Sequence, residues 1–148
     1  MEPFEWFYVY NSSRSVDMKT DLDITADLQN LRKVEKLIDD LSMELDLSDE
    51  IYGNVLVATM EATNNAIIHG SASNPNKRVF VRIAKKENQL VIHIEDQGKG
   101  FDYEKVPDPT APENLEKING RGIFLMDRLS DEMNFLNKGR VVELKFYV

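Results

Sequence analysis

Two long helical segments follow each other directly in this chain, and this order limits the folds open to it. Apolar residues recur at three- and four-residue steps over 28–45, which is the spacing of one buried helix face. Ser48 stands where a helix N-cap is expected, and a second helix is predicted from there to His69, ending at Gly70. Because no strand separates the two helices, the chain does not fit a fold in which strands and helices alternate regularly.

Several shorter segments have the alternating apolar and polar residues of half-buried strands. Residues 79–83 and 90–94 alternate in this way and are predicted to form an antiparallel hairpin. A second hairpin is predicted from 133–136 and 141–148, with its turn at Asn137-Lys138-Gly139. A short helix is predicted at 123–129, just before this closing hairpin.

Two further segments complete the predicted domain, which is expected to be a single one over residues 1–148. Phe4–Tyr10 is rich in aromatic residues and is predicted to form a strand, with a second short strand near 16–22. Residues 102–119 contain three prolines and little apolar periodicity, which predicts a loop. Together these segments predict an α+β fold, a two-layer sandwich with helices on one face of a mixed, mostly antiparallel sheet.

The composition excludes several classes of function. The chain has no cysteine, which removes disulfides, thiolate metal sites and cysteine nucleophiles. Its net charge of −8 argues against a protein that coats nucleic acid, since neutralising phosphates requires clustered Lys and Arg. No apolar run approaches the roughly 20 residues of a membrane span, and the N-terminus does not have the pattern of a signal peptide. A cytoplasmic protein without direct nucleic-acid or membrane contact is therefore expected.

A first cluster of polar residues lies on the second predicted helix. Glu61, Asn65 and His69 are four residues apart, so they lie along one helix face. A carboxylate here can accept a proton or bind a cation, and the amide oxygen of Asn65 is a hard ligand suited to Mg²⁺. The neighbouring Ala62 and Ala66 are small, which allows a ligand to approach closely. The alternative interpretation is a solvated polar stripe on an amphipathic helix.

A second cluster, Asp96-Gln97-Gly98-Lys99-Gly100, follows directly on the strand predicted at 90–94. Gly98 and Gly100 allow unusual backbone angles and a close approach of backbone to a ligand. Asp96 can accept a hydrogen bond from an amino group such as that of adenine. The alternative is an ordinary turn at the end of a strand, because Asp, Gly and Lys are common turn residues.

A third cluster, Gly120-Arg121-Gly122, precedes the helix predicted at 123–129. Free N–H groups at a helix N-terminus bind phosphate, and glycines let the phosphate come close. The alternative is a flexible loop exit, after which the apolar helix residues simply pack into the core.

In this order, the three clusters resemble the N, G1 and G2 boxes of the GHKL superfamily of ATPases and kinases. Within that superfamily the chain is similar to the bacterial anti-sigma-factor serine kinases. The phrases that carry this closer resemblance are Glu-Ala-Thr-Asn-Asn-Ala-Ile-Ile-His-Gly at 61–70 and Gly-Arg-Gly-Ile-Phe-Leu-Met at 120–126. The resemblance extends over about residues 22–148.

The resemblance implies a site for ATP and Mg²⁺. Asn65 would ligate the metal ion, and Asp96 would bind the adenine amino group. Gly98 and Gly100 would open the base pocket. Glu61 would be the general base that accepts the proton of a substrate serine hydroxyl.

The resemblance also assigns the loop and the third cluster. Residues 102–119 would form a lid over ATP, and the backbone N–H groups at Gly120 and Gly122 would hold phosphate. Positive charge near the phosphates could come from any of three residues, and the sequence does not choose among them: Lys99, Lys117 and Arg121.

For the whole protein, the resemblance implies a homodimer that binds a sigma factor and phosphorylates a STAS-domain antagonist. One alternative is a nucleotide-binding regulatory module that catalyses no transfer, although such a module would not need Glu61. Another is a detached histidine-kinase catalytic domain. The third is an α+β protein that binds no nucleotide.

Overall fold

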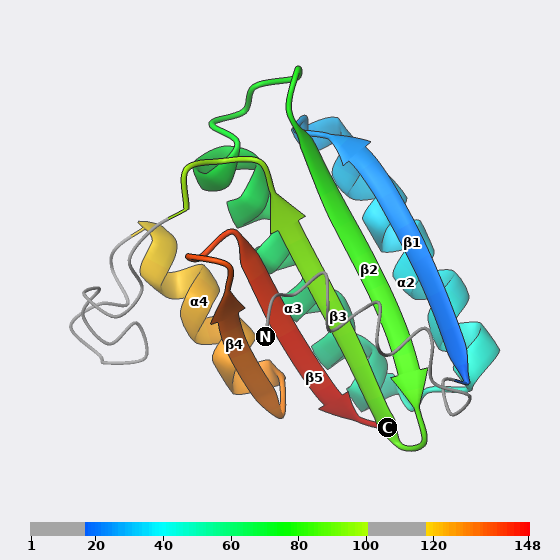
Figure 1. Cartoon of the computed structure of the whole chain (residues 1–148). Coiled ribbons are helices and arrows are strands. Elements are labelled where there is room, and N and C mark those ends of the chain that lie inside the picture. Colours follow the sequence, from blue (N-terminus) through cyan, green and yellow to red (C-terminus); the bar gives the residue numbers. More distant parts are fainter. Residues whose placement is uncertain (1–16, 101–117) are drawn as a thin grey trace.

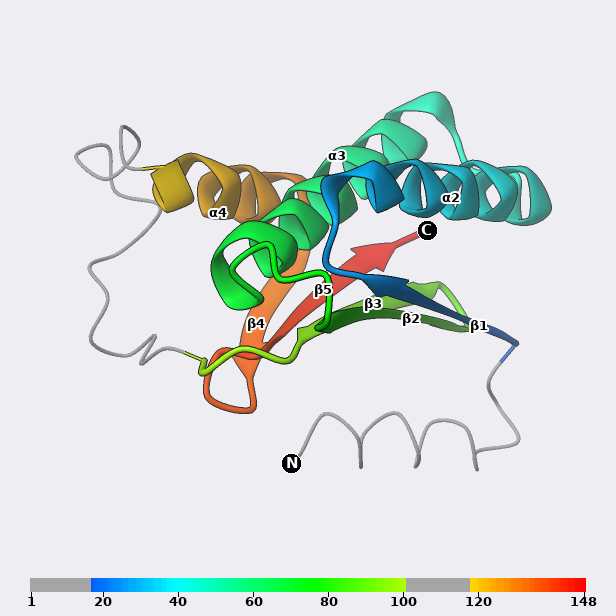
Figure 2. The ribbon, with the colours of Figure 1, turned by 90° about the horizontal axis from the view of Figure 1, so that it is seen from above.

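The computed structural model describes residues 17–100 and 118–148, and for residues 118–121 it describes the backbone alone. Within these residues three α-helices cover one face of a five-stranded sheet (Figures 1 and 2), which confirms the predicted two-layer α+β sandwich. The strand order is β1-β2-β3-β5-β4, and each of the four pairings is antiparallel. The elements are β1 (Met18–Thr25), α2 (Leu31–Leu45), α3 (Asp49–Asn65), β2 (Arg78–Lys86), β3 (Gln89–Asp96), α4 (Ile118–Leu129), β4 (Glu132–Leu136) and β5 (Val141–Tyr147).

The two consecutive helices form where the sequence predicts them. The first begins with a 3₁₀ turn, Leu28–Asn30, which is capped by the Asp27 carboxylate accepting a hydrogen bond from the Gln29 N–H at 2.9 Å. In α3 the predicted cap is confirmed, since Ser48 Oγ accepts a hydrogen bond from the Ile51 N–H at 3.2 Å. The buried face of α2 consists of three residues of the predicted apolar stripe: Val34, Ile38 and Leu41.

Both predicted hairpins are confirmed. β2 and β3 pair directly, and the turn between β4 and β5 has positive φ angles of 50° at Asn137, 57° at Lys138 and 82° at Gly139. The short strand predicted near 16–22 is β1, which runs from Met18 to Thr25. The strand predicted at Phe4–Tyr10 lies outside the described residues, as does the predicted lid except for its last two residues.

The hydrophobic core lies between the sheet and the helices. β3 contributes Leu90, Ile92 and Ile94 to this core, as the alternation along the strand requires. The opposing surface includes small residues of α3, of which Ala58 and Ala62 are buried. None of the helices in the described part of the chain is long and apolar enough to cross a membrane.

Candidate functional site

A cavity of about 650 Å³ opens between α3, α4 and the end of β3. This volume is within the range of small-molecule sites, roughly 300–1,000 Å³. The cavity lining includes residues of the first two clusters that the sequence singles out, and Ile123, which directly follows the third cluster. Its lining includes Ala62, Asn65, Ala66, His69, Gly70, Lys77, Asp96, Lys99, Gly100, Ile123, Met126, Gly139 and Val142.

The first and third clusters meet where α4 packs against α3. Gly122 of α4 lies so close to α3 that a Cβ added to it would stand 3.1 Å from Glu61 Oε2 and 3.1 Å from Asn65 Nδ2. A methyl group at position 122 would therefore require these two side chains to shift by a few tenths of an ångström. The structure thus brings together Glu61, Asn65 and Gly122, which are far apart in the sequence.

The start of α4 differs from the prediction. The helix begins at Ile118, five residues before the predicted start at 123, so the sequence-based boundary was wrong. Glycines disfavour helix in isolation, but packing against α3 outweighs that local preference. Gly120 consequently lies in the first turn, where N–H groups lack partners within the helix, whereas Gly122 lies in the next turn. The side chain of Arg121 lies outside what the structure describes.

The second cluster packs against Gly70, in the helical turn that follows α3, through the Asp96 carboxylate and the Gly98 backbone. A Cβ on Gly70 would overlap the Asp96 carboxylate, and a Cβ on Gly98 would overlap the carbonyl of Gly70. The Gly98 N–H donates to Asp96 Oδ1 at 2.7 Å, while the Asp96 N–H donates to the carbonyl of Arg140 at 3.0 Å. These contacts hold the Asp96 carboxylate at the wall of the cavity.

A π-helical turn at Ala66–Gly70 makes this contact possible. In it the Ser71 N–H donates to the Ala66 carbonyl at 2.8 Å, which closes a wider turn than an α-helix has. The turn places His69 and Gly70 on the cavity wall. Regular helical spacing does not reveal a π turn, so the sequence predicted only a continuous helix to His69.

One carboxylate and two lysine amines are among the described side chains that line the cavity. Burial is the largest influence on the Asp96 carboxyl and raises its pKa above the ordinary value. The hydrogen bond from Gly98 and the charges of Arg140 and Lys77 act in the opposite direction and offset part of this increase. Lys77 and Lys99 line the cavity and provide positive charge beside it. Of the three cations considered from the sequence, Lys99 is the one that the described structure places there, and Lys77 was missed because it follows an unremarkable polar loop.

The residues present fit a magnesium nucleotide. Mg²⁺ usually keeps several waters and is held by one or two protein oxygens together with substrate phosphates. One amide oxygen from Asn65 at the cavity wall is compatible with that mode of binding. Among the described residues there is no group of three or more His, Asp or Glu that could hold a metal ion by itself.

A matched pair of glycine variants tests the packing at Gly122. We expect Gly122→Ala to disturb Glu61 and Asn65 and to reduce any activity that depends on them. Gly53→Ala is the control, because a Cβ there meets nothing within 4 Å, and in a helix alanine is more stable than glycine by about 1 kcal/mol. Thermal denaturation should show a stabilised Gly53→Ala protein with unchanged function. A fully active Gly122→Ala protein would contradict the importance of this contact.

Comparison with known proteins defines the class to which this site belongs. The family model for the histidine kinase-like ATPase domain matches residues 24–146, so the chain belongs to that family. The chain is also 31% identical over 108 residues to the serine-protein kinase RsbW of Oceanobacillus iheyensis, a match covering 68% of each protein. It is 37% identical over 105 residues to the anti-sigma F factor of Heyndrickxia coagulans, covering 66% of this chain and 69% of that protein.

A solved structure supports the same fold. The RsbU and RsbW domains of a Mycobacterium tuberculosis protein superpose with a TM-score of 0.65 at 14% sequence identity. The match covers 88% of this chain, which spans 32% of the length of that protein. At this identity the likeness concerns the fold alone.

Proposed function

We propose that this protein is an ATP-dependent anti-sigma-factor serine/threonine kinase. The observation that carries the proposal is the convergence of Asn65, Asp96 and Gly100 on one cavity, with Glu61 beside Asn65. The relatives support it, since proteins similar to this chain over about two thirds of their length are a serine-protein kinase and anti-sigma F factors.

Within this proposal each residue has a separate task. Asp96 accepts a hydrogen bond from the adenine amino group, in the space that Gly98 and Gly100 leave open. Asn65 holds Mg²⁺, which neutralises charge on the phosphates when the nucleotide is bound. Lys99 provides further positive charge at the cavity wall.

The phosphate end of the site is assigned to the third cluster. The first turn of α4 offers N–H groups at Gly120 and Arg121 to phosphate, and Gly122 lets α4 approach the catalytic helix. The lid at 102–119 would close over the nucleotide. Of the lid, the described structure includes only residues 118 and 119.

Phosphoryl transfer needs positioning and charge neutralisation more than covalent assistance from the protein. Glu61 and Asn65 are one helical turn apart on α3, so a base and a metal ligand point to the same region. Glu61 accepts the proton of the serine hydroxyl as that oxygen bonds to the γ-phosphorus and the bond to ADP breaks. The presence of Glu61 favours a kinase over a module that only binds nucleotide, because such a module would not need a base.

The proposal extends to partners and context. A sigma factor and a STAS-domain antagonist are the proposed protein partners, and the protein would regulate transcription through them without contacting nucleic acid or membrane. A cytoplasmic homodimer with residues 1–148 as one ATP-binding domain is proposed for the assembly.

A thermal-shift experiment tests the nucleotide site. A ligand present at 100 times its dissociation constant stabilises the folded protein by about 2.7 kcal/mol, so Mg-ATP and Mg-ADP should both raise the melting temperature. Mg-GTP is the control, because guanine has a carbonyl group at the position where adenine has the amino group that Asp96 would recognise. The absence of any shift at millimolar Mg-ATP would contradict the proposed function.

A further inference from the structure

The connection 71–77 between the π turn and β2 brings to the cavity a charged residue that belongs to none of the sequence clusters. Hydrogen bonds hold this connection in place. The Ser73 N–H donates to the Ile67 carbonyl at 2.8 Å, and the Lys77 N–H donates to the Asn74 carbonyl at 2.9 Å. Lys77, the last residue of the connection, lines the cavity, so this segment provides a cation to the site.

The backbone at Lys77 is fixed on both sides. The Lys77 carbonyl accepts a hydrogen bond from the Ala26 N–H at 2.9 Å, which joins it to the residue that follows β1. The N–H of the next residue, Arg78, donates to Gln97 Oε1 at 2.8 Å, which joins it to the residue that follows β3. Because separate segments of the chain meet at Lys77, its side chain starts from a fixed position.

The strand register places Lys77 and Asp96 on the same face of the sheet. Val79 of β2 is the direct cross-strand partner of Asp96, and Lys77 precedes Val79 by two residues. Side chains two residues apart along a strand point to the same face, and Val79 belongs to the core beneath the helices. Diagonal neighbours on two paired strands are within reach of long side chains. The Lys77 amine and the Asp96 carboxylate therefore share one end of the cavity, which both residues line.

The charge of Lys77 acts on Asp96. Burial is the largest influence on the pKa of the Asp96 carboxyl and raises it, and the charge of Lys77 is among the influences that offset part of this increase. An ionised carboxylate only accepts hydrogen bonds, and a lysine ammonium group only donates them. This end of the cavity thus presents an acceptor and a donor side by side.

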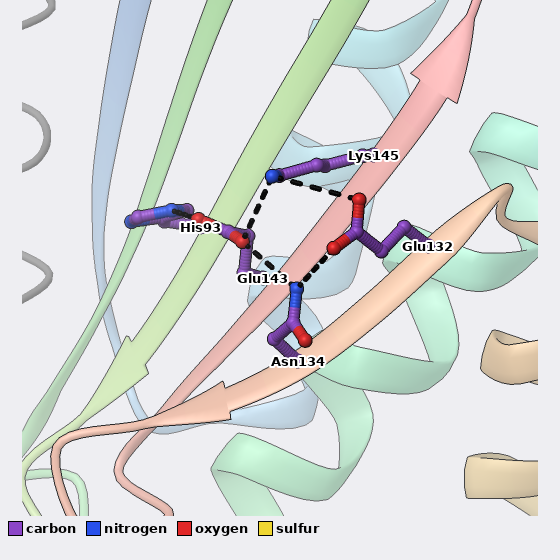
Figure 3. A network of polar contacts seen from close by, with 5 residues as sticks. All are labelled: His93, Glu132, Asn134, Glu143 and Lys145. Carbon is purple, nitrogen blue, oxygen red and sulfur yellow. Dashed lines mark hydrogen bonds and ion pairs between the residues drawn. The ribbon is translucent and has the colours of Figure 1, made fainter.

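The amine of Lys77 is available to a ligand, whereas that of another lysine, Lys145, is used within the sheet. Lys145 lies on the sheet face opposite the helices, where its Nζ is 3.6 Å from Glu132 Oε2 and 3.7 Å from Glu143 Oε1 (Figure 3). Within residues 17–100 and 118–148, no carboxylate forms an ion pair with Lys77. Its three N–H donors can therefore point to a molecule in the cavity.

We propose that Lys77 is a base-recognition residue, whose amine donates a hydrogen bond to a ring nitrogen of adenine while Asp96 accepts one from the neighbouring amino group. This inference rests on the nucleotide site proposed above and adds a residue that selects the base. Adenine has its amino donor beside ring nitrogens that accept hydrogen bonds, N1 on one side and N7 on the other, so an adjacent carboxylate and ammonium group match this edge. The phosphates are assigned to the first turn of α4 and to Asn65, which leaves the cation beside Asp96 to the base.

Calorimetry on the full chain tests the proposal with Mg-ATP and its 1-deaza and 7-deaza analogues. Each analogue keeps the amino group and has a CH group in place of one ring nitrogen. The unchanged chain should bind one of the two analogues about tenfold more weakly than Mg-ATP, a difference of about 1.4 kcal/mol. Lys77→Met should bind Mg-ATP about tenfold more weakly than the unchanged chain does, and should show no further loss with that analogue, because the contact is already absent. Lys145→Met is the matched control and should bind all three nucleotides as the unchanged chain does.

The outcomes separate this proposal from the function on which it rests. Equal weakening of all three nucleotides by Lys77→Met would overturn the proposal in favour of a charge that acts on the phosphates. Unaltered binding of Mg-ATP by Lys77→Met would also overturn it, while the nucleotide site itself would stand. If Lys77→Met does not fold, the unchanged chain decides, since binding both analogues as tightly as Mg-ATP overturns the proposal. An unchanged chain that binds none of the three nucleotides would overturn the proposed function and this proposal together.

Discussion

Replacing Glu61 with glutamine should lower the rate of phosphoryl transfer about 10²–10⁴-fold, the usual contribution of a general base. Glutamine has nearly the same shape, so the packing against Gly122 is kept, but its amide does not accept the serine proton. ATP binding should be unchanged, because the adenine and metal contacts are assigned to Asp96 and Asn65. The measurement is transfer of labelled γ-phosphate to an antagonist protein, with ATP affinity determined separately.

The control for this variant is Glu44→Gln, the same chemical change at an exposed position of α2. It should leave both transfer and ATP affinity unaltered. If Glu61→Gln transferred phosphate as fast as the unchanged protein, Glu61 would not be the base. Loss of ATP binding in Glu61→Gln would instead show that the residue has a structural role at the site.

Replacing Asp96 with asparagine should have opposite effects on binding and on stability. Hydrogen bonds to charged groups contribute about 1.5–3 kcal/mol, so losing the carboxylate should weaken ATP binding about 10–100-fold. Calorimetry with Mg-ATP measures this loss. Asp46→Asn is the control, because Asp46 is an exposed residue with a positive φ of 52°, which asparagine tolerates.

The effect of Asp96→Asn on stability follows from the pKa of the carboxyl. Burial raises the folded-state pKa of Asp96 above its ordinary value, so between those two values the folded state binds more protons than the unfolded state. Stability therefore falls as pH rises through this window, and the loss persists at neutral pH. We expect the unliganded Asp96→Asn protein to melt at a higher temperature than the unchanged protein at pH 7, and the difference to shrink at acidic pH. Equal melting temperatures at both pH values would contradict this.

The sequence was sufficient to predict most of the fold and part of the site. Periodicity located both long helices and both hairpins, because alternation and helical spacing directly reflect which side chains are buried. The residues predicted to bind adenine and metal, Asp96 and Asn65, do lie on one cavity. Their roles remain predictions, because chemistry at a site is decided by what binds there.

The remaining features depend on contacts between distant segments. The early start of α4 comes from packing against α3, which local glycine preferences oppose. The π turn at Ala66–Gly70, which brings Gly70 against Asp96, is not visible in regular helical spacing. Lys77 lies at the cavity because of how the chain folds, and it belongs to none of the motifs in the sequence.

Transfer of labelled γ-phosphate from Mg-ATP to a serine of a purified STAS-domain antagonist tests the central claim most directly. We expect incorporation with the unchanged protein, none when the acceptor serine is replaced by alanine, and a rate lowered about 10²–10⁴-fold with Glu61→Gln. A protein that bound Mg-ATP with the expected thermal shift yet transferred no phosphate to any such antagonist encoded beside it would contradict the kinase assignment and leave a nucleotide-binding regulatory module.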